Sequence, residues 1–191
     1  MTEPKDGFKL LMEALDRLDI PFLIGCSLAS SVHGVVRATQ DIDLVADIRA
    51  DHADPLAKAL APDFYADPVM MKDALRVGQG FNVIHYSSSY KFDIFPLTSD
   101  PYHQTEFQRR KKVTSLLFGP DPVEFPVATA EDTVLTKLVW FKAGGGVSDR
   151  QWNDLLGIAK VQKDHLDVSY MRKWAKHLGV EDLLEKLLPR G

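Results

Sequence analysis

Hydrophobic and polar residues follow one another with two different periods along this chain, and each period predicts its own kind of element. Apolar residues at helical spacing, separated by charged ones, predict an amphipathic helix over residues 6–19. The wholly apolar run Phe22–Ile24 predicts a strand that is covered on both faces and ends at Gly25. Small and apolar residues then predict a short helix over Ser27–Val36, and a second apolar run predicts a strand over Ile42–Ile48.

The middle of the chain is richer in strand patterns, and polar turns between them indicate hairpins. Pro122 and Pro126 identify the second hairpin as an edge element, because proline cannot donate to a sheet ladder. The predicted elements are a helix over 51–61, a strand near 64–67, strands over 81–86 and 90–97 joined by a serine turn, a surface helix or loop over 103–112, and a hairpin of 113–118 with 123–127.

After Thr129 the pattern becomes helical and stays so. Thr129 and Asp132 form a helix start of the capping-box kind, and Ser148 caps the next helix. The predicted helices run from Thr129 to about 143, from Ser148 to about 161, over 168–178 and over 181–188.

The order of these elements predicts an α/β (α+β) fold in which a mixed sheet is flanked by helices. A chain of 191 residues is long enough for one well-cored domain and short for two. We therefore expect an α/β core over residues 1–128 and a C-terminal helical part over residues 129–191, packed together as one unit.

Composition and charge narrow the function classes. Hydrophobic residues make up 45% of the chain and charged residues 26%, as in an ordinary globular protein. A formal net charge of -4 gives no overall attraction to nucleic acid, so no DNA binding is indicated. The basic run Arg109-Arg110-Lys111-Lys112 is then either a local patch for phosphates or a solvated face.

The single cysteine and the absence of long apolar runs bear on location. Cys26 cannot form an intramolecular disulfide, and no secretory leader precedes the first helix. No apolar run approaches the roughly 18 to 20 residues that span a bilayer. These features predict a cytoplasmic protein that does not enter a membrane.

Three aspartates on predicted strands are the main candidates for chemistry. Side chains in a strand alternate between its faces, so Asp41 and Asp43 point to one side and their apolar neighbours to the other. Asp93 is out of pattern, because it lies in the apolar run KFDIFPL. Mg²⁺ prefers oxygen ligands and uses few carboxylates. The set is therefore a candidate magnesium site; the alternative is a solvated strand end, with Asp41 capping a turn.

The turn ahead of these aspartates offers a complementary site. The residues Gly25 to Ser27 stand at a helix start, where free backbone N–H groups and the helix dipole favour anions such as phosphates. Arg37 either meets the same phosphates or pairs with the aspartates at the surface. Cys26 has no base to activate it and is expected to be a buried, inert thiol, and His33 is expected to be a hydrogen-bonded structural residue.

The sequence resembles the nucleotidyltransferase superfamily at these positions. The pattern is the turn Gly25-Cys26-Ser27, the pair Asp41-Ile42-Asp43 and a distant third carboxylate, Asp93. The longer stretch GCSLASSVHGVVRATQDIDLV is similar to the minimal nucleotidyltransferase-like proteins around the AbiEii toxin family. Glu131-Asp132, Lys137-Leu138 and the segment 149–154 look like the helical motifs of that group.

The resemblance implies transfer of a nucleoside monophosphate from a nucleoside triphosphate to an acceptor hydroxyl, with release of pyrophosphate and with two Mg²⁺ ions, or Mn²⁺ in their place. It implies that Asp41 and Asp43 ligate the metals and that Asp93 completes the site and helps to deprotonate the acceptor. It also implies that the triphosphate contacts Gly25, Ser27 and Lys137.

The acceptor, whether protein, RNA or small molecule, is not identified by these motifs. Cys26 is a departure, because many members of the superfamily have glycine or serine directly after the first glycine. The alternative is a catalytically inactive nucleotide-binding or partner-binding module, such as a toxin–antitoxin component.

Overall fold

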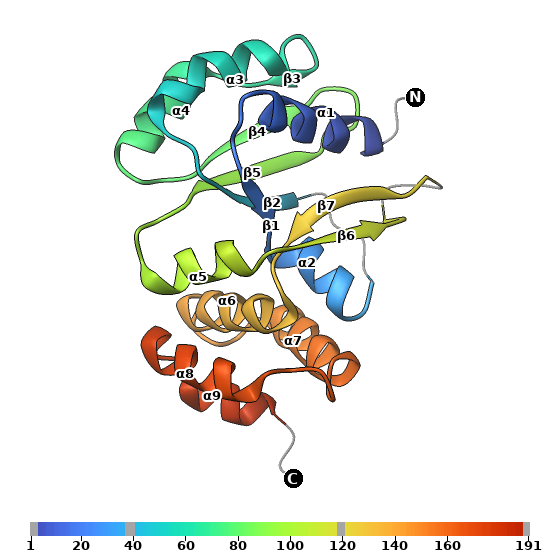
Figure 1. Ribbon diagram of the computed structural model, residues 1–191, viewed down its shortest axis with the longest axis vertical. Coiled ribbons are helices and arrows are strands. Elements are labelled where there is room, and N and C mark those ends of the chain that lie inside the picture. The colour runs from blue at the N-terminus through green and yellow to red at the C-terminus, as the bar shows by residue number, and fades with distance from the viewer. Residues whose placement is uncertain (1–3, 37–40, 118–120, 189–191) are drawn as a thin grey trace.

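The computed structural model describes residues 4–36, 41–117 and 121–188. Within these residues, seven strands form one mixed sheet in the order β3-β4-β5-β2-β1-β7-β6 (Figure 1). The mixed sheet with helices around it confirms the predicted fold class. The strands are β1 (Phe22–Ile24), β2 (Asp41–Ala46), β3 (Phe64–Tyr65), β4 (Phe81–His85), β5 (Lys91–Pro96), β6 (Lys111–Ser115) and β7 (Val123–Val127).

The helices lie on both sides of this sheet. In Figure 1, α1, α3 and α4 lie above the strands, whereas α5 and α6 lie below them, with α8 and α9 farthest away at the C-terminal end. The helices are α1 (Pro4–Arg17), α2 (Cys26–His33), the short 3₁₀ helix η1 (Ala50–His52), α3 (Ala53–Leu60), α4 (Pro68–Arg76), α5 (Pro101–Arg109), α6 (Ala130–Ala143), α7 (Asp149–Val161), α8 (Val168–Leu178) and α9 (Glu181–Leu187).

The pairing of the central strands determines which candidate site residues lie next to each other. Strand β2 runs parallel to β5, and residue 43 is the Cα partner of residue 93. On its other side β2 pairs antiparallel with β1, which in turn runs parallel to β7. A parallel pair needs a long crossover between its strands, and here residues 47–90 supply it, carrying α3, α4 and the paired strands β3 and β4.

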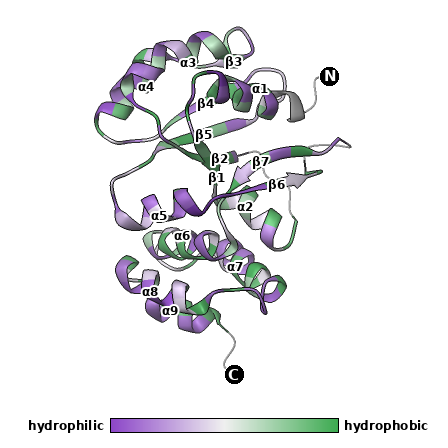
Figure 2. Ribbon diagram, viewed as in Figure 1, coloured by the Kyte–Doolittle hydropathy of each residue, from purple (hydrophilic) through white to green (hydrophobic). Residues whose placement is uncertain are grey.

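The main core lies between the sheet and α1 and α3. Phe8 and Leu11 of α1, Ile42 and Phe92 of the sheet, and Leu56 of α3 are fully buried in one apolar cluster. Figure 2 shows the apolar colouring concentrated on β1 and β2 at the centre of the molecule. Burial of these side chains holds both central strands in place, at roughly 1.5 to 3 kcal/mol for each large residue.

A second apolar cluster joins the C-terminal helices. Leu138 of α6, Ile158 of α7, Trp174 of α8 and Leu184 of α9 pack together. The same cluster contains Tyr102 of α5, which precedes the predicted boundary at residue 128. The division into a core over 1–128 and a helical part over 129–191 stays a prediction.

The predicted helix starts are confirmed in the C-terminal part. The Thr129 side chain accepts a hydrogen bond from the backbone N–H of Asp132, and the Ser148 side chain accepts one from that of Gln151. Gly179 ends α8 in the left-handed conformation, with φ at 68°, which glycine adopts at no steric cost.

Helix α4 is missing from the sequence-based prediction. It begins with Asp67, whose carboxylate accepts hydrogen bonds from the N–H groups of Val69 and Met70, and Pro68 follows at the first helical position. Those two residues are a recognisable start signal. Val69 and Met70 are apolar but exposed. The apolar residues of this segment therefore do not follow one buried helix face, and the helical pattern was not recognised.

The charged segment 103–112 also differs from the prediction. Residues 103–109 belong to α5, in agreement with the helix alternative, but residues 111–112 begin the strand β6, which pairs with β7. Figure 2 shows α5 mostly in the hydrophilic colour, yet Tyr102, Glu106 and Phe107 are buried. One side of α5 is therefore buried. The paired strands β6 and β7 lie at the edge of the sheet, as the prolines predicted.

None of the helices in the described ranges combines the length and the apolarity that a bilayer crossing needs.

Candidate functional site

The open face of β2 and β5 carries three rows of paired side chains. The parallel register matches Asp41 with Lys91, Asp43 with Asp93, and Val45 with Phe95. The intervening residues of both strands are buried in the main core. The predicted alternation of faces along β2 is confirmed, and the register adds Asp93 to the face that Asp41 and Asp43 share.

Lys91 lies among these carboxylates. Its Nζ atom is 2.8 Å from Oδ2 of Asp93 and 3.5 Å from Oδ1 of Asp41. The hydrogen bond to Asp93, followed by the charges of both carboxylates, raises the pKa of Lys91 above its ordinary value. The ammonium group of Lys91 therefore forms ion pairs with two of the three carboxylates.

Asp43 is half-buried, whereas Asp41 is exposed. Burial raises the pKa of its carboxyl, and the neighbouring Asp93 carboxylate raises it further. The backbone N–H of Ser27 acts in the opposite direction, because it donates a hydrogen bond to the Asp43 carboxylate. Desolvation and the repulsion between the two carboxylates both disfavour the charged form of Asp43. A cation bound between the carboxylates would offset both effects.

The donor set fits a hard divalent cation by its chemistry. Three carboxylates on one face of two adjacent strands supply the oxygen ligands that Mg²⁺ takes, and Asp43 lacks a full counter-charge. Across the described ranges, no three side chains of His, Cys, Asp or Glu are already gathered as a metal site. The Lys91 ammonium pairs with two of the candidate ligands instead.

The predicted phosphate turn leads directly from β1 into α2. Gly25 has an extended backbone, and its N–H donates to the carbonyl of Asp43 at 3.0 Å. Cys26 then turns the chain with φ at 44°. The Ser27 N–H thus points toward the Asp43 carboxylate. The start of α2 therefore lies against Asp43, and a shared site for the turn and the carboxylates stays a prediction.

Cys26 lies in this turn as a neutral thiol. Burial, and then the Asp43 charge, raise its pKa to about 12. A thiol with such a pKa carries almost no thiolate at neutral pH, and the thiolate is the nucleophilic form. This agrees with the expectation of an inert thiol.

Lys137 lies opposite the turn, on α6. Its side chain is only 6% exposed, and its Nζ atom is 2.9 Å from Oδ2 of Asp154 on α7. Together with Ser27, Asp43 and Arg150 it lines a polar cavity of about 260 Å³. Two cationic side chains, the carboxylates of Asp43 and Asp154 and the N-terminus of α2 thus line one cavity.

A second cavity adjoins the polar one. Its volume is about 190 Å³, and it lies between the sheet, α5 and α6. The two cavities have four lining residues in common, so they meet beside Asp43. Those shared residues are Cys26, Asp43, Phe95 and Trp140.

Two of these lining residues were not identified from the sequence as parts of a site. Trp140 is 48% exposed and lines both cavities. Phe95 lies two residues after Asp93 on the same face of β5. That spacing was the available signal for Phe95, whereas no local pattern distinguished Trp140.

The remaining candidates have other places. Arg37 lies outside the described residues. His33 hydrogen-bonds through Nε2 to the carbonyl of Ala128 at 2.7 Å, which is a structural role. In the basic run, Arg110 stacks on Phe107, while Lys112 pairs with Glu124 across the β6–β7 ladder.

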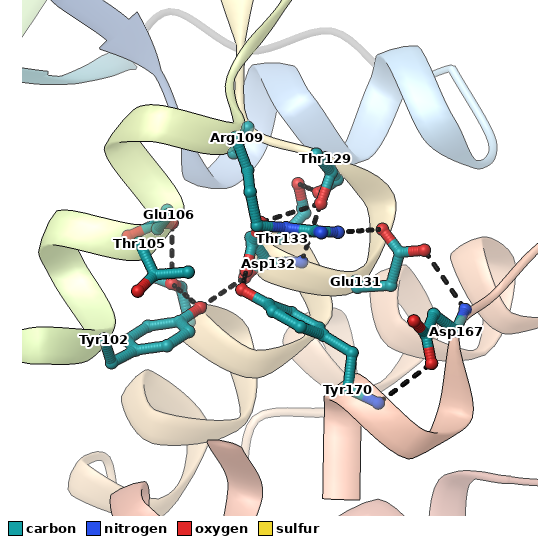
Figure 3. A network of polar contacts seen from close by, with 12 residues as sticks. Tyr102, Thr105, Glu106, Arg109, Thr129, Glu131, Asp132, Thr133, Asp167 and Tyr170 are labelled. Atoms are coloured by element: carbon teal, nitrogen blue, oxygen red, sulfur yellow. Dashed lines mark hydrogen bonds and ion pairs between the residues drawn. The ribbon is translucent and has the colours of Figure 1, made fainter. Parts of the chain in front are cut away.

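A buried polar network lies behind the cavities and ties three helices together (Figure 3). Asp132 of α6 is fully buried. Its carboxylate accepts hydrogen bonds from Arg109 Nε of α5 at 3.1 Å and from the Tyr170 hydroxyl of α8 at 2.5 Å. Figure 3 shows the Arg109 side chain reaching across to Glu131 as well. Arg109 therefore has a structural role in this network and is not part of a solvated face.

Comparison with known proteins identifies the fold. No family model and no curated protein matches the chain. An antigenic nucleotidyltransferase-like protein from Paracoccidioides brasiliensis aligns over 99% of this chain and 96% of its own, with a TM-score of 0.53 and 14% identity. The chain has a nucleotidyltransferase-like fold. The solution structure of the antibiotic-resistance factor ANT(2″)-Ia aligns over 95% of this chain and 96% of its own, with a TM-score of 0.52 and 12% identity.

At these identities the nucleotidyltransferase fold is what the comparisons establish. They show no relation to the AbiEii toxin group, so that finer resemblance stays a prediction. The roles of individual residues rest on the geometry of this chain, because one fold hosts many activities.

Proposed function

We propose that this protein is a Mg²⁺-dependent nucleotidyltransferase that moves a nucleoside monophosphate from a nucleoside triphosphate to an acceptor hydroxyl. One observation carries the proposal. Asp43 and Asp93 are register partners on adjacent parallel strands, and the N–H of Ser27 at the start of α2 donates to the Asp43 carboxylate. A carboxylate pair and a phosphate-binding helix start thus meet at one point beside a cavity.

In this proposal Asp41, Asp43 and Asp93 hold the divalent cations, with Mg²⁺ or Mn²⁺ as the fitting ions. When bound, these ions supply charge neutralisation for the phosphoryl oxygens during an in-line displacement. The ion pairs of Lys91 with Asp41 and Asp93 would have to break when these carboxylates bind the metal ions.

The residues of the polar cavity bind the triphosphate. Lys137 and Arg150 place two positive charges along it, and the positive end of the α2 dipole lies at its Cys26–Ser27 side. The buried pairing with Asp154 fixes the Lys137 ammonium in position. Charges that are oriented in advance stabilise the developing phosphoryl charge without further reorganisation.

The transfer step then follows from these positions. The acceptor oxygen forms a bond to the α-phosphorus, and the bond from that phosphorus to the oxygen bridging to the β-phosphate breaks, releasing pyrophosphate. The acceptor proton passes to the Asp93 carboxylate, which supports the attack as a general base.

A direct test uses Asp43→Asn, with Asp47→Asn as its matched control, because Asp47 is an exposed aspartate just beyond the end of the same strand. The variant Asp43→Asn is expected to lose Mg²⁺-dependent binding of nucleoside triphosphates and the transfer of label from an α-labelled triphosphate, while the control keeps both. Unchanged binding and transfer in Asp43→Asn would overturn the assignment.

The Lys91 pairing favours one alternative, a module that binds nucleotide without transferring it. An ammonium group among the carboxylates would serve such a module as a fixed counter-charge. Incubation with α-labelled triphosphates, Mg²⁺ and a cell lysate separates the two. Label that becomes attached to protein, RNA or a small molecule supports the enzyme, whereas binding without attachment supports the module.

A further inference from the structure

The apolar cavity beside Asp43 has the dimensions of a binding site for one ring. Its volume is about 190 Å³, and an apolar cavity of about 150 Å³ is enough to bind benzene. Val45 and Phe95 of the sheet form its floor, and Trp140 of α6 contributes an aromatic wall. These residues offer van der Waals contact on several sides but few polar groups.

One end of this cavity holds a buried carboxyl group. Glu106 of α5 lines the cavity and is only 5% exposed. Its Oε1 atom accepts a hydrogen bond from the Thr136 hydroxyl at 3.0 Å. Burial, and then the charge of Asp132, raise the pKa of Glu106 to about 8. An acid in such surroundings gains from a cationic hydrogen-bond donor, which supplies a counter-charge.

The other end of the cavity is Asp43, where the polar cavity begins. The two cavities extend from this point toward different helices. The apolar cavity reaches His103 and Glu106 of α5, and the polar cavity reaches Arg150 and Asp154 of α7. In Figure 1, α5 and α7 lie at different ends of α6, which separates them in this view.

The chemistry of displacement assigns a ligand to each side. In an in-line reaction the attacking oxygen and the leaving pyrophosphate lie on opposite sides of the phosphorus. The cationic residues Lys137 and Arg150 mark the polar side as the place of the pyrophosphate. With the phosphorus beside Asp43, the acceptor hydroxyl must come from the apolar side.

We propose that the apolar cavity is the acceptor site and takes a small molecule with a single-ring apolar body, an amine that pairs with Glu106, and a hydroxyl at the other end that reaches Asp43. This assignment rests on the proposed function. It selects a small molecule over a protein or RNA acceptor, because a cavity of about 190 Å³ has the size of a whole ring-sized ligand.

Direct binding of three probe molecules to the full chain, without nucleotide or metal, tests the cavity. Tyramine has the ring, the amine and the hydroxyl; 4-ethylphenol lacks the amine, and ethanolamine lacks the ring. In titration calorimetry, tyramine is expected to bind about tenfold more tightly than either of the other probes. 4-Ethylphenol lacks the charge-assisted hydrogen bond of the amine, and ethanolamine lacks the buried ring.

Three variants connect the binding to the residues. Glu106→Gln keeps the shape of the side chain and is expected to weaken tyramine about tenfold while leaving 4-ethylphenol unchanged. Trp140→Ala, at a position that is 48% exposed, is expected to weaken the binding of both ring probes. Glu124→Gln is the control, because Glu124 pairs with Lys112 on the exposed β6–β7 ladder.

Two results would overturn the acceptor site. The first is tyramine binding that is no tighter than ethanolamine binding, or that is equal in wild type and both cavity variants. The second is displacement of tyramine by adenosine or another nucleoside, which would make the cavity a nucleobase site. The proposed function has its own readout in triphosphate binding by Asp43→Asn, so loss of one proposal leaves the other standing.

Discussion

The ammonium of Lys91 lies 2.8 Å from Oδ2 of Asp93, two residue pairs away from the Asp43–Asp93 match in the register of β2 and β5. It also lies 3.5 Å from Asp41. A lysine side chain is long and flexible, so this pairing is a competitor of any divalent cation for the same oxygens.

Removal of that competitor should strengthen metal binding. In Lys91→Gln, the affinity for Mn²⁺ is expected to rise about tenfold, because the carboxylates lose a positive neighbour within 4 Å. Electron paramagnetic resonance of free Mn²⁺ measures this directly. Lys72→Gln, which removes an ammonium paired with Asp54 away from the site, is the control. Equal or weaker Mn²⁺ affinity in Lys91→Gln would show that Lys91 does not compete.

Asp43 should cost the protein stability when no cation is bound. Burial and the neighbouring Asp93 raise its pKa, so its charged form is disfavoured in the folded state. Asp43→Asn is expected to raise the free energy of unfolding in urea at pH 7 with EDTA by about 1 kcal/mol. The Asp47→Asn control should not change it. A less stable Asp43→Asn would mean that the hydrogen bond from the Ser27 N–H outweighs both costs.

Glu106 should make stability fall as pH rises. Its folded pKa is about 8, above the ordinary value of 4.5, so the folded state holds a proton that the unfolded state has lost. The stabilisation is fully present below the unfolded pKa and disappears as pH rises through the folded one. Urea unfolding between pH 5 and pH 9 is expected to show this decline in wild type and a flatter profile in Glu106→Gln. Parallel profiles would contradict a buried, protonated Glu106.

The Asp132 network should contribute strongly to stability. Arg109→Ala leaves a fully buried carboxylate without its cation and is expected to lower the free energy of unfolding by about 3 kcal/mol. Replacing Asp132 by Asn in the same chain should restore part of the loss, since the uncompensated charge is then gone. The control is Arg172→Ala, which breaks an exposed pair with Glu185 and should change stability little. Equal losses in both arginine variants would rule out a special role for Asp132.

Local patterns predicted much of the fold. The strand Phe22–Ile24, the alternation of faces along Asp41 to Leu44 and the caps at Thr129 and Ser148 depend on neighbouring residues only, and the structure confirms them. The resemblance to the nucleotidyltransferase superfamily was confirmed at the level of fold. Its metal ligands and substrate contacts stay proposals.

Burial was predicted less well, because it depends on what packs against an element. Helix α5 has a hydrophilic sequence, yet Tyr102 and Glu106 are buried against α6. Trp140 has the sequence environment of a core residue, yet its ring lines the two cavities. Which side of a helix is buried depends on the elements that pack against it. When those elements are distant in the chain, local composition does not predict the buried side.

The sequence by itself determined that Asp41 and Asp43 share a face and that a helix starts just after Gly25, because both follow from the geometry of single elements. Only the tertiary structure decided what those groups meet. The parallel register of β2 against β5 places Asp93 beside Asp43 and Lys91 beside Asp41, and helices α5 and α6 enclose the cavity next to them. Strand register and helix packing are set by contacts between distant residues, and these contacts create the site.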